Sequence, residues 1–160
     1  MKNLILIRHA HAESENLLQN DFERKLIPQG ILEAEKLGAF IKTKKDKPDY
    51  IIASSAYRTL ETAKIASENF NFPAEKIFFK IELYNSSFQK LIEQIRSLDS
   101  SIINLALVGH NPGISQLSTA LVASGSYQLA PSAAVSLRFE IRQWSELTAG
   151  TGTENWYYYP

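Results

Sequence analysis

Two arginines and two histidines of this sequence each follow an apolar segment, and together they could bind and transfer a phosphate. The four residues are Arg8, His9, Arg58 and His110. Arg8 and His9 come directly after the apolar run Leu4–Ile7, and the other two come shortly after the segments 50–55 and 102–108. Open α/β sheets bind ligands at the carboxyl ends of their strands. We therefore expect these side chains to meet at one edge of a sheet.

The residue types indicate phosphoryl transfer. This reaction needs a nucleophile in line with the leaving group and donors around the non-bridging oxygens. Arg8, Arg58 and His110 could supply the donors, because the planar fork of arginine matches two phosphate oxygens at once. His9 could attack through one neutral ring nitrogen. The two guanidinium groups disfavour imidazolium, and the other nitrogen is expected to donate to a carbonyl or carboxylate.

Apolar runs alternate with helix-like stretches, which predicts an α/β fold. The runs at 3–8 and 102–108 are continuous, as is typical of central strands covered on both faces. Apolar and polar residues alternate along 134–141. This period of two predicts a half-exposed strand near an edge of the sheet, where it can run antiparallel. The aromatic tail 156–160 could form a short strand or pack against a neighbour. Strands are expected at 3–8, 50–54, 76–80, 102–108 and 134–141.

Helix starts between these strands have recognisable signals. Pro28 suits the first position of one helix, and Asn111 could cap another that has Pro112 at its first position. Ser86 with Gln89 resembles a capping box. A further helix is expected from residue 56. The inward stripes are predicted to be Ile31, Ala34, Leu37 and Ile41, then Leu60, Ala63 and Ala66, then Leu91, Ile92 and Ile95, and finally Ile114, Leu117 and Leu121.

Composition narrows the class of protein. The 160 residues fit one domain, 1–160, that can bury a core. The 17 basic and 17 acidic side chains cancel, so we expect neither a nucleic-acid nor a membrane partner. The absence of cysteine removes disulfides, thiolate catalysis and zinc–thiolate sites. The first apolar run is too short for a signal peptide, which makes a cytoplasmic location the expectation.

Several motifs of this sequence occur together in one known family, in the same order and across nearly the whole chain. They are Leu6–Ala10, Arg24–Leu26 with Gly30, Ser54–Thr59 with Thr62 and Ala63, Glu82–Asn85, Val108–Gly113 and Ser132–Ala134. The chain thereby resembles the histidine phosphatase superfamily (phosphoglycerate mutase-like), and within it the short bacterial phosphohistidine phosphatases of the SixA type. The resemblance implies a three-layer α/β/α sandwich with a mostly parallel central sheet.

The resemblance also implies roles for individual residues. His9 corresponds to the residue that is transiently phosphorylated, and Arg8, Arg58 and His110 correspond to the phosphate pocket. Arg24 matches a family arginine that reaches the substrate. The family uses no metal and no organic cofactor. The implied partner is a phosphohistidine-bearing protein, for example a component of a phosphorelay.

The general acid is where this sequence departs most from the family. Members that cleave phosphate esters carry a carboxylate in the segment matching 81–85, nearest to Tyr84 or Asn85. Glu82 lies two residues early, which along a strand is roughly 7 Å away. An alkoxide leaving group needs a donated proton, whereas the imidazole of phosphohistidine can leave already protonated. The sequence therefore favours P–N over P–O cleavage. Ile27, where many members have threonine, alters the cap of the first helix.

Three alternatives remain open at this point. The first is a small-molecule phosphomonoesterase with Glu82 or Glu13 as its acid. The second is a module that binds phosphate or a phosphoprotein without turnover, although such a module has no need of an in-line imidazole. The third uses His9, His11 and Glu13 as metal ligands, a spacing that a strand allows but that the neighbouring arginines oppose. Otherwise His11 is interpreted as a residue at the rim of the pocket.

Overall fold

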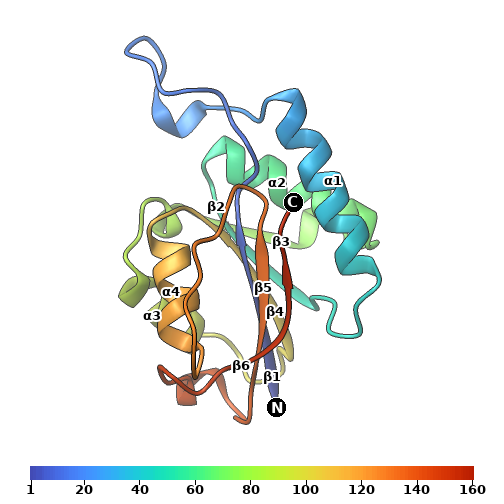
Figure 1. Cartoon of the computed structure of the whole chain (residues 1–160), viewed down its shortest axis with the longest axis vertical. Helices are drawn as coiled ribbons and strands as arrows, with labels where there is room; N and C mark the ends of the chain where they lie inside the picture. The colour runs from blue at the N-terminus through green and yellow to red at the C-terminus, as the bar shows by residue number, and fades with distance from the viewer.

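One six-stranded sheet forms the centre of the structure. The computed structural model describes residues 1–160, and its strands lie in the order β3-β2-β4-β1-β5-β6 (Figure 1). The first four in this order are parallel, whereas β5 is antiparallel to both β1 and β6. The strands are β1 (Lys2–Arg8), β2 (Tyr50–Ser54), β3 (Ile77–Lys80), β4 (Asn104–Gly109), β5 (Ala134–Phe139) and β6 (Thr153–Tyr158).

Helices cover both faces of this sheet, which confirms the predicted α/β/α class. α1 (Pro28–Lys42) and α2 (Tyr57–Asn69) pack together on one face, and α3 (Phe88–Arg96) and α4 (Gly113–Leu121) lie on the other (Figure 1). None of these helices is both long and apolar enough to cross a lipid bilayer. The short 3-10 helices are η1 (Asp21–Glu23), η2 (Ala74–Lys76), η3 (Ile81–Leu83) and η4 (Trp144–Glu146).

The continuous apolar run of β1 has a packing reason. Successive side chains of a strand point to opposite faces of the sheet. Leu4 and Leu6 belong to the core beneath α3 and α4, whereas Ile5 and Ile7 belong to the core beneath α1 and α2. Because helices cover both faces, every position of the run is buried. The strand that ends in Arg8 is therefore anchored from both sides.

The C-terminal part of the sheet differs from the prediction. β5 is antiparallel as expected, but it is not half-exposed, because Arg138 is its only exposed residue. β5 is also not the edge strand. Residues 156–158 of the aromatic tail belong to β6, which pairs with β5 and takes the edge of the sheet.

The first helix begins at Pro28 as predicted, but its buried face is partly different. Ala34, Leu37 and Ile41 are buried, whereas Ile31 is 40% exposed. Gly30 faces inward instead. A Cβ on Gly30 would lie 2.0 Å from the carbonyl oxygen of His11, so only glycine lets the helix approach this close to the end of β1.

The caps of the third and fourth helices also differ from the prediction. Ser87, not Ser86, accepts the capping hydrogen bond at the start of α3. α4 begins at Gly113, one residue later than expected, and Pro112 rather than Asn111 occupies the N-cap position. The predicted stripe of α4 is buried as expected, which shows that its periodicity was a better guide than its cap.

Candidate active site

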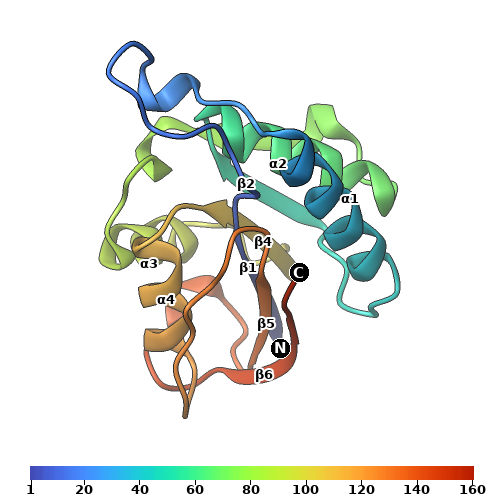
Figure 2. The same ribbon diagram turned by 45° about the horizontal axis from the view of Figure 1, so that its top comes forward.

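The register of the parallel strands places the predicted residues side by side. Arg8 ends β1 and pairs with Gly109 of β4, and the backbone N–H of His9 donates to the Gly109 carbonyl at 3.1 Å. His110 directly follows β4, and Arg58 lies in the first turn of α2, after β2. Because β2 also pairs with β4 in parallel, the carboxyl ends of these strands lie at one edge of the sheet (Figure 2). The side chains that end or follow these strands therefore come together there.

All five predicted site residues line a single cleft of about 410 Å³. They are Arg8, His9, Arg24, Arg58 and His110. The segment between β1 and α1 adds Glu15 and Asp21 to the lining, and the segments after η3 and β4 add Tyr84, Asn85 and Asn111. The cleft is rich in cations and hydrogen-bond donors, as an anion requires.

The environment of His9 prepares one ring nitrogen for attack. Its Nδ1 lies 2.8 Å from the carbonyl oxygen of Ala10. A carbonyl only accepts, so Nδ1 carries the proton and Nε2 of the neutral ring keeps its lone pair. Burial is the main cause that lowers the pKa of His9 to about 4, and the charges of Arg58, Arg8 and Arg24 act in the same direction. The ring is therefore neutral near pH 7, as predicted, although burial contributes more than the arginines.

This pKa can be measured in the free protein. We expect the imidazole carbon resonances of His9 to titrate with a midpoint of about 4, well below the ordinary value of about 6.5. A His9→Asn variant assigns the resonance. Added tungstate should raise the midpoint, because a bound anion stabilises imidazolium. A midpoint near 6.5 without ligand would contradict the burial and charge described above.

His110 is held on the other side of the cleft as a second neutral ring. Its Nε2 lies 2.8 Å from Ser54 Oγ, and its centroid is 5.3 Å from that of His9. Burial chiefly lowers the pKa of His110 to about 3, with further contributions from His9 and Arg58. Its Nδ1 is buried and has no protein partner. When the Ser54 hydroxyl donates to Nε2, Nδ1 keeps its proton and can donate to a ligand.

Arg8 and Arg58 each keep a buried hydrogen-bond donor unused. Arg58 is 4% exposed, and the Nε groups of both Arg8 and Arg58 are buried without a protein partner. Arg8 uses Nη1 to donate to the carbonyl of Leu129 at 3.0 Å. In the first turn of α2, the cation of Arg58 opposes the helix dipole, so an anion next to it is favourable.

Asp21 supplies such an anion, and the sequence analysis missed it. Its Oδ2 accepts hydrogen bonds from Arg58 Nη2 at 2.9 Å and from the Tyr84 hydroxyl at 2.5 Å, and its Oδ1 accepts from Arg24 Nη1 at 2.6 Å. Partial burial acts to raise the pKa of Asp21, but the bonds from Tyr84, Arg24 and Arg58 together hold it far below its usual range. Asp21 is therefore an ionised carboxylate that orients cations and has no proton to give.

Neither carboxylate considered from the sequence as an acid lines the cleft. The residue Glu82 is exposed. Glu13 is engaged elsewhere, and the hydrogen bonds from the Lys25 backbone and the Gln19 amide keep the pKa of Glu13 below its usual range. Glu15, which the sequence analysis did not single out, does line the cleft, with its side chain 83% exposed.

His11 turns away from the catalytic cleft. Its Nδ1 lies 2.8 Å from Glu33, and the residue lines a different hollow. His9 and Glu13 have the separate partners described above, so these side chains do not converge. No group of three or more histidine, aspartate or glutamate side chains in the structure is arranged to hold a metal ion.

Sequence comparisons identify the family of this chain. The sequence model of the histidine phosphatase superfamily (branch 1) matches residues 4–97. An uncharacterised chloroplastic protein of Arabidopsis thaliana is 27% identical over 97% of this chain and 74% of its own length.

Solved structures with the same fold extend over almost the whole chain. A candidate phosphohistidine phosphatase SixA from Nakamurella multipartitia superposes with a TM-score of 0.86 at 22% identity, over 99% of this chain and 96% of its own. The protein histidine phosphatase SixA complexed with tungstate gives a TM-score of 0.81 at 20% identity, over 97% of this chain and 95% of its own. At these identities the comparison establishes a shared fold.

Proposed function

Because this chain belongs to the histidine phosphatase superfamily (branch 1), we propose that it hydrolyses phosphohistidine on a protein through a phosphorylated His9. One observation carries the proposal. A neutral imidazole with a free Nε2 shares one cleft with two arginines that each keep a buried donor unused and with a second histidine that has an unused nitrogen. These are a nucleophile and the donors that phosphoryl transfer needs.

In the first step, the lone pair of His9 Nε2 attacks phosphorus and the P–N bond of the substrate breaks. The leaving imidazole keeps the electron pair of that bond and departs neutral, because its other nitrogen was already protonated. Arg8, Arg58 and His110 donate to the three non-bridging oxygens, and Arg24 reaches the substrate from the rim. His9 Nδ1 keeps its proton throughout and donates a hydrogen bond to the Ala10 carbonyl.

In the second step, water attacks phosphorus and the bond to His9 Nε2 breaks. The electron pair returns to Nε2, the proton of water passes to solvent, and inorganic phosphate leaves. The neutral ring with its proton on Nδ1 is restored. The enzyme needs no metal and no organic cofactor in either step.

The preference for a P–N bond follows from the carboxylates. Asp21 is ionised and bonded to three partners, and the other two candidate acids lie outside the cleft. A leaving alkoxide would therefore lack a placed proton donor, whereas a protonated phosphoimidazole does not need one. This difference supports phosphohistidine over a phosphate ester as the substrate.

One observation favours a second candidate, a small-molecule phosphomonoesterase. Glu15 is a carboxylate on the rim of the cleft that is free of strong hydrogen bonds, since it lies 3.4 Å from Arg24 Nη1. If it swings over a bound ester, it could protonate the leaving oxygen.

Initial rates on two classes of substrate test the proposal. We expect kcat/KM for phosphohistidine to exceed that for p-nitrophenyl phosphate and sugar phosphates by roughly 100-fold or more. Glu15→Gln and Glu82→Gln should leave phosphohistidine hydrolysis unchanged. Faster ester hydrolysis that is lost in Glu15→Gln would establish the second candidate instead. Binding of phosphate without turnover of either class would indicate a binding module.

A further inference from the structure

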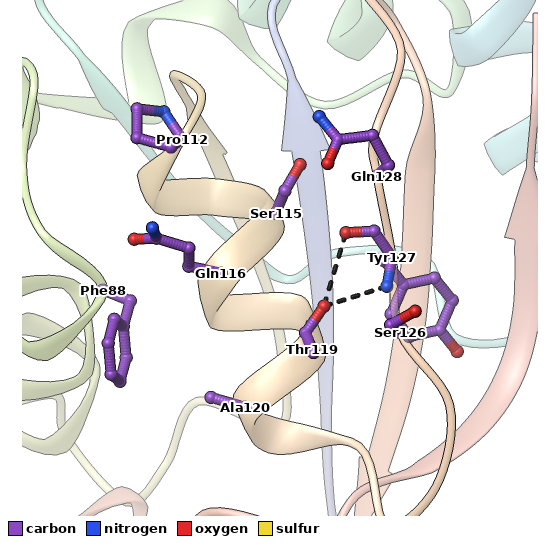
Figure 3. Close-up of a pocket in the computed structure, with 9 residues that line it drawn as sticks. All are labelled: Phe88, Pro112, Ser115, Gln116, Thr119, Ala120, Ser126, Tyr127 and Gln128. Carbon is purple, nitrogen blue, oxygen red and sulfur yellow. Dashed lines mark hydrogen bonds between the residues drawn. The ribbon is translucent and has the colours of Figure 1, made fainter.

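A second hollow, of about 540 Å³, extends along α4 (Figure 3). Its floor is the exposed side of α4, and its walls are Phe88 of α3 and the extended stretch 126–128. The two sites meet at one peptide unit, because Asn111 lines the cleft and Pro112 lines the hollow. The lining residues are Phe88, Pro112, Ser115, Gln116, Thr119, Ala120, Ser126, Tyr127 and Gln128.

The hollow is a built feature, because side-chain hydrogen bonds tie its wall to α4. Thr119 Oγ1 accepts from the Tyr127 backbone N–H at 2.9 Å and donates to the Tyr127 carbonyl at 3.3 Å (Figure 3). One turn earlier, Ser115 Oγ accepts from the Leu129 backbone N–H at 3.0 Å. Two hydroxyls of the helix thus hold the extended stretch in place.

The same bonds connect the hollow to the phosphate-binding residues. Ser115 Oγ donates to Asn111 Oδ1 at 2.6 Å, and Asn111 Nδ2 donates to the Leu129 carbonyl at 3.0 Å. That carbonyl also accepts from Arg8 Nη1 at 3.0 Å. A molecule seated in the hollow therefore lies against a wall that shares its hydrogen bonds with Arg8.

The lining chemistry identifies the class of ligand. The hollow has no charged side chain, whereas five of the ten residues that line the cleft beside it are charged. Gln116, Gln128 and Ser126 offer amides and a hydroxyl that donate and accept, as the groups of a peptide backbone do. Phe88 and Pro112 add apolar surface for a side chain. A second phosphate would find no cation here.

We propose that this hollow binds the polypeptide segment that flanks the phosphohistidine of the substrate. The inference rests on the proposed function and adds to it a reason for protein specificity. Because the hollow lies next to the cleft, one polypeptide can occupy both sites at once. Its phosphohistidine then lies in the cleft, and the neighbouring residues lie in the hollow. An extended segment advances about 3.3 Å per residue, so only a few residues beyond the histidine are needed.

Filling the hollow provides the test. Gln116 is exposed on α4, and its side chain makes no hydrogen bond within the protein. Gln116→Trp should therefore fold and obstruct the floor of the hollow. The probes are free phosphohistidine and a neutral peptide of about 12 residues with one central phosphohistidine. Gln143→Trp is the matched control, because Gln143 is exposed beside η4, which contacts the opposite end of the sheet through the Trp144 bond to Ile102.

We expect Gln116→Trp to lower kcat/KM for the peptide by about 10-fold or more and to leave free phosphohistidine within about twofold of the parent. The control should change neither. Equal effects of Gln116→Trp on both probes, or no effect on the peptide, would overturn the inference. Failure of the parent to hydrolyse either probe would instead overturn the proposed function, so the two failures are distinguishable.

Discussion

Replacing His9 with alanine should abolish turnover. The substitution removes the only imidazole in the cleft whose Nε2 is left free by a bond from Nδ1 to a backbone carbonyl. Loss of the nucleophile in enzymes with covalent intermediates costs roughly 10⁴-fold or more in kcat. Rates measured with phosphohistidine would show the loss directly. Substrate labelled in its phosphoryl group, followed by an alkaline quench, should label the parent and leave the variant unlabelled.

His11→Ala is the matched control for this experiment. His11 lies two positions along the chain, bonds to Glu33 and lines a different hollow. Its removal should preserve both labelling and rate. A His9→Ala protein whose rate is within about tenfold of the parent rate would exclude the covalent role of His9. The hydrogen-bond donors alone do not supply so large a share of the rate enhancement.

Replacing Arg58 with alanine should have the second largest effect. Its guanidinium is 4% exposed and keeps one N–H group without a partner, in a site where water screens charges poorly. Loss of one donor to a developing oxyanion costs about 3–4 kcal/mol in other enzymes, which is roughly 10²–10³-fold in kcat. Stopped assays on phosphohistidine measure this loss, and thermal unfolding shows whether the variant is folded.

Two further variants separate charge from geometry at this position. Arg58→Lys keeps the cation but loses the planar fork, so it should recover only part of the rate. Asp21→Asn keeps Arg58 but weakens the bonds that orient it, and we expect a smaller loss than for Arg58→Ala. An Arg58→Ala rate within about tenfold of the parent would remove Arg58 from the site.

Local pattern was sufficient to predict most of the fold. The continuous apolar runs located β1 and β4, because strands between two helical layers must be apolar at every position. The same reasoning predicted that residues just after these strands would share one edge, and Arg8, His9 and His110 do so. The pattern within one segment does not show which strands pair. It therefore did not decide whether the aromatic tail forms a strand, and the pairing of β6 with β5 does.

The errors arose where a contact with backbone outside the helix competes with the pattern of the helix itself. Ile31 fits the apolar stripe of α1, but Gly30 turns inward because the backbone of His11 passes too close for a Cβ. Ser86 fits a capping box, but the helix begins one residue later, and Ser86 instead bonds to the carbonyl of Glu82.

The sequence by itself determined which reactive side chains this protein has and at which strand ends they lie, because those depend on residue type and on periodicity within one segment. Only the tertiary structure decided their chemical state. The neutrality of His9 and of His110 and the ionised state of Asp21 each depend on partners or on burial contributed by other segments. Hydrogen bonding and desolvation depend on distances in space, and the separation of residues along the chain does not determine those distances.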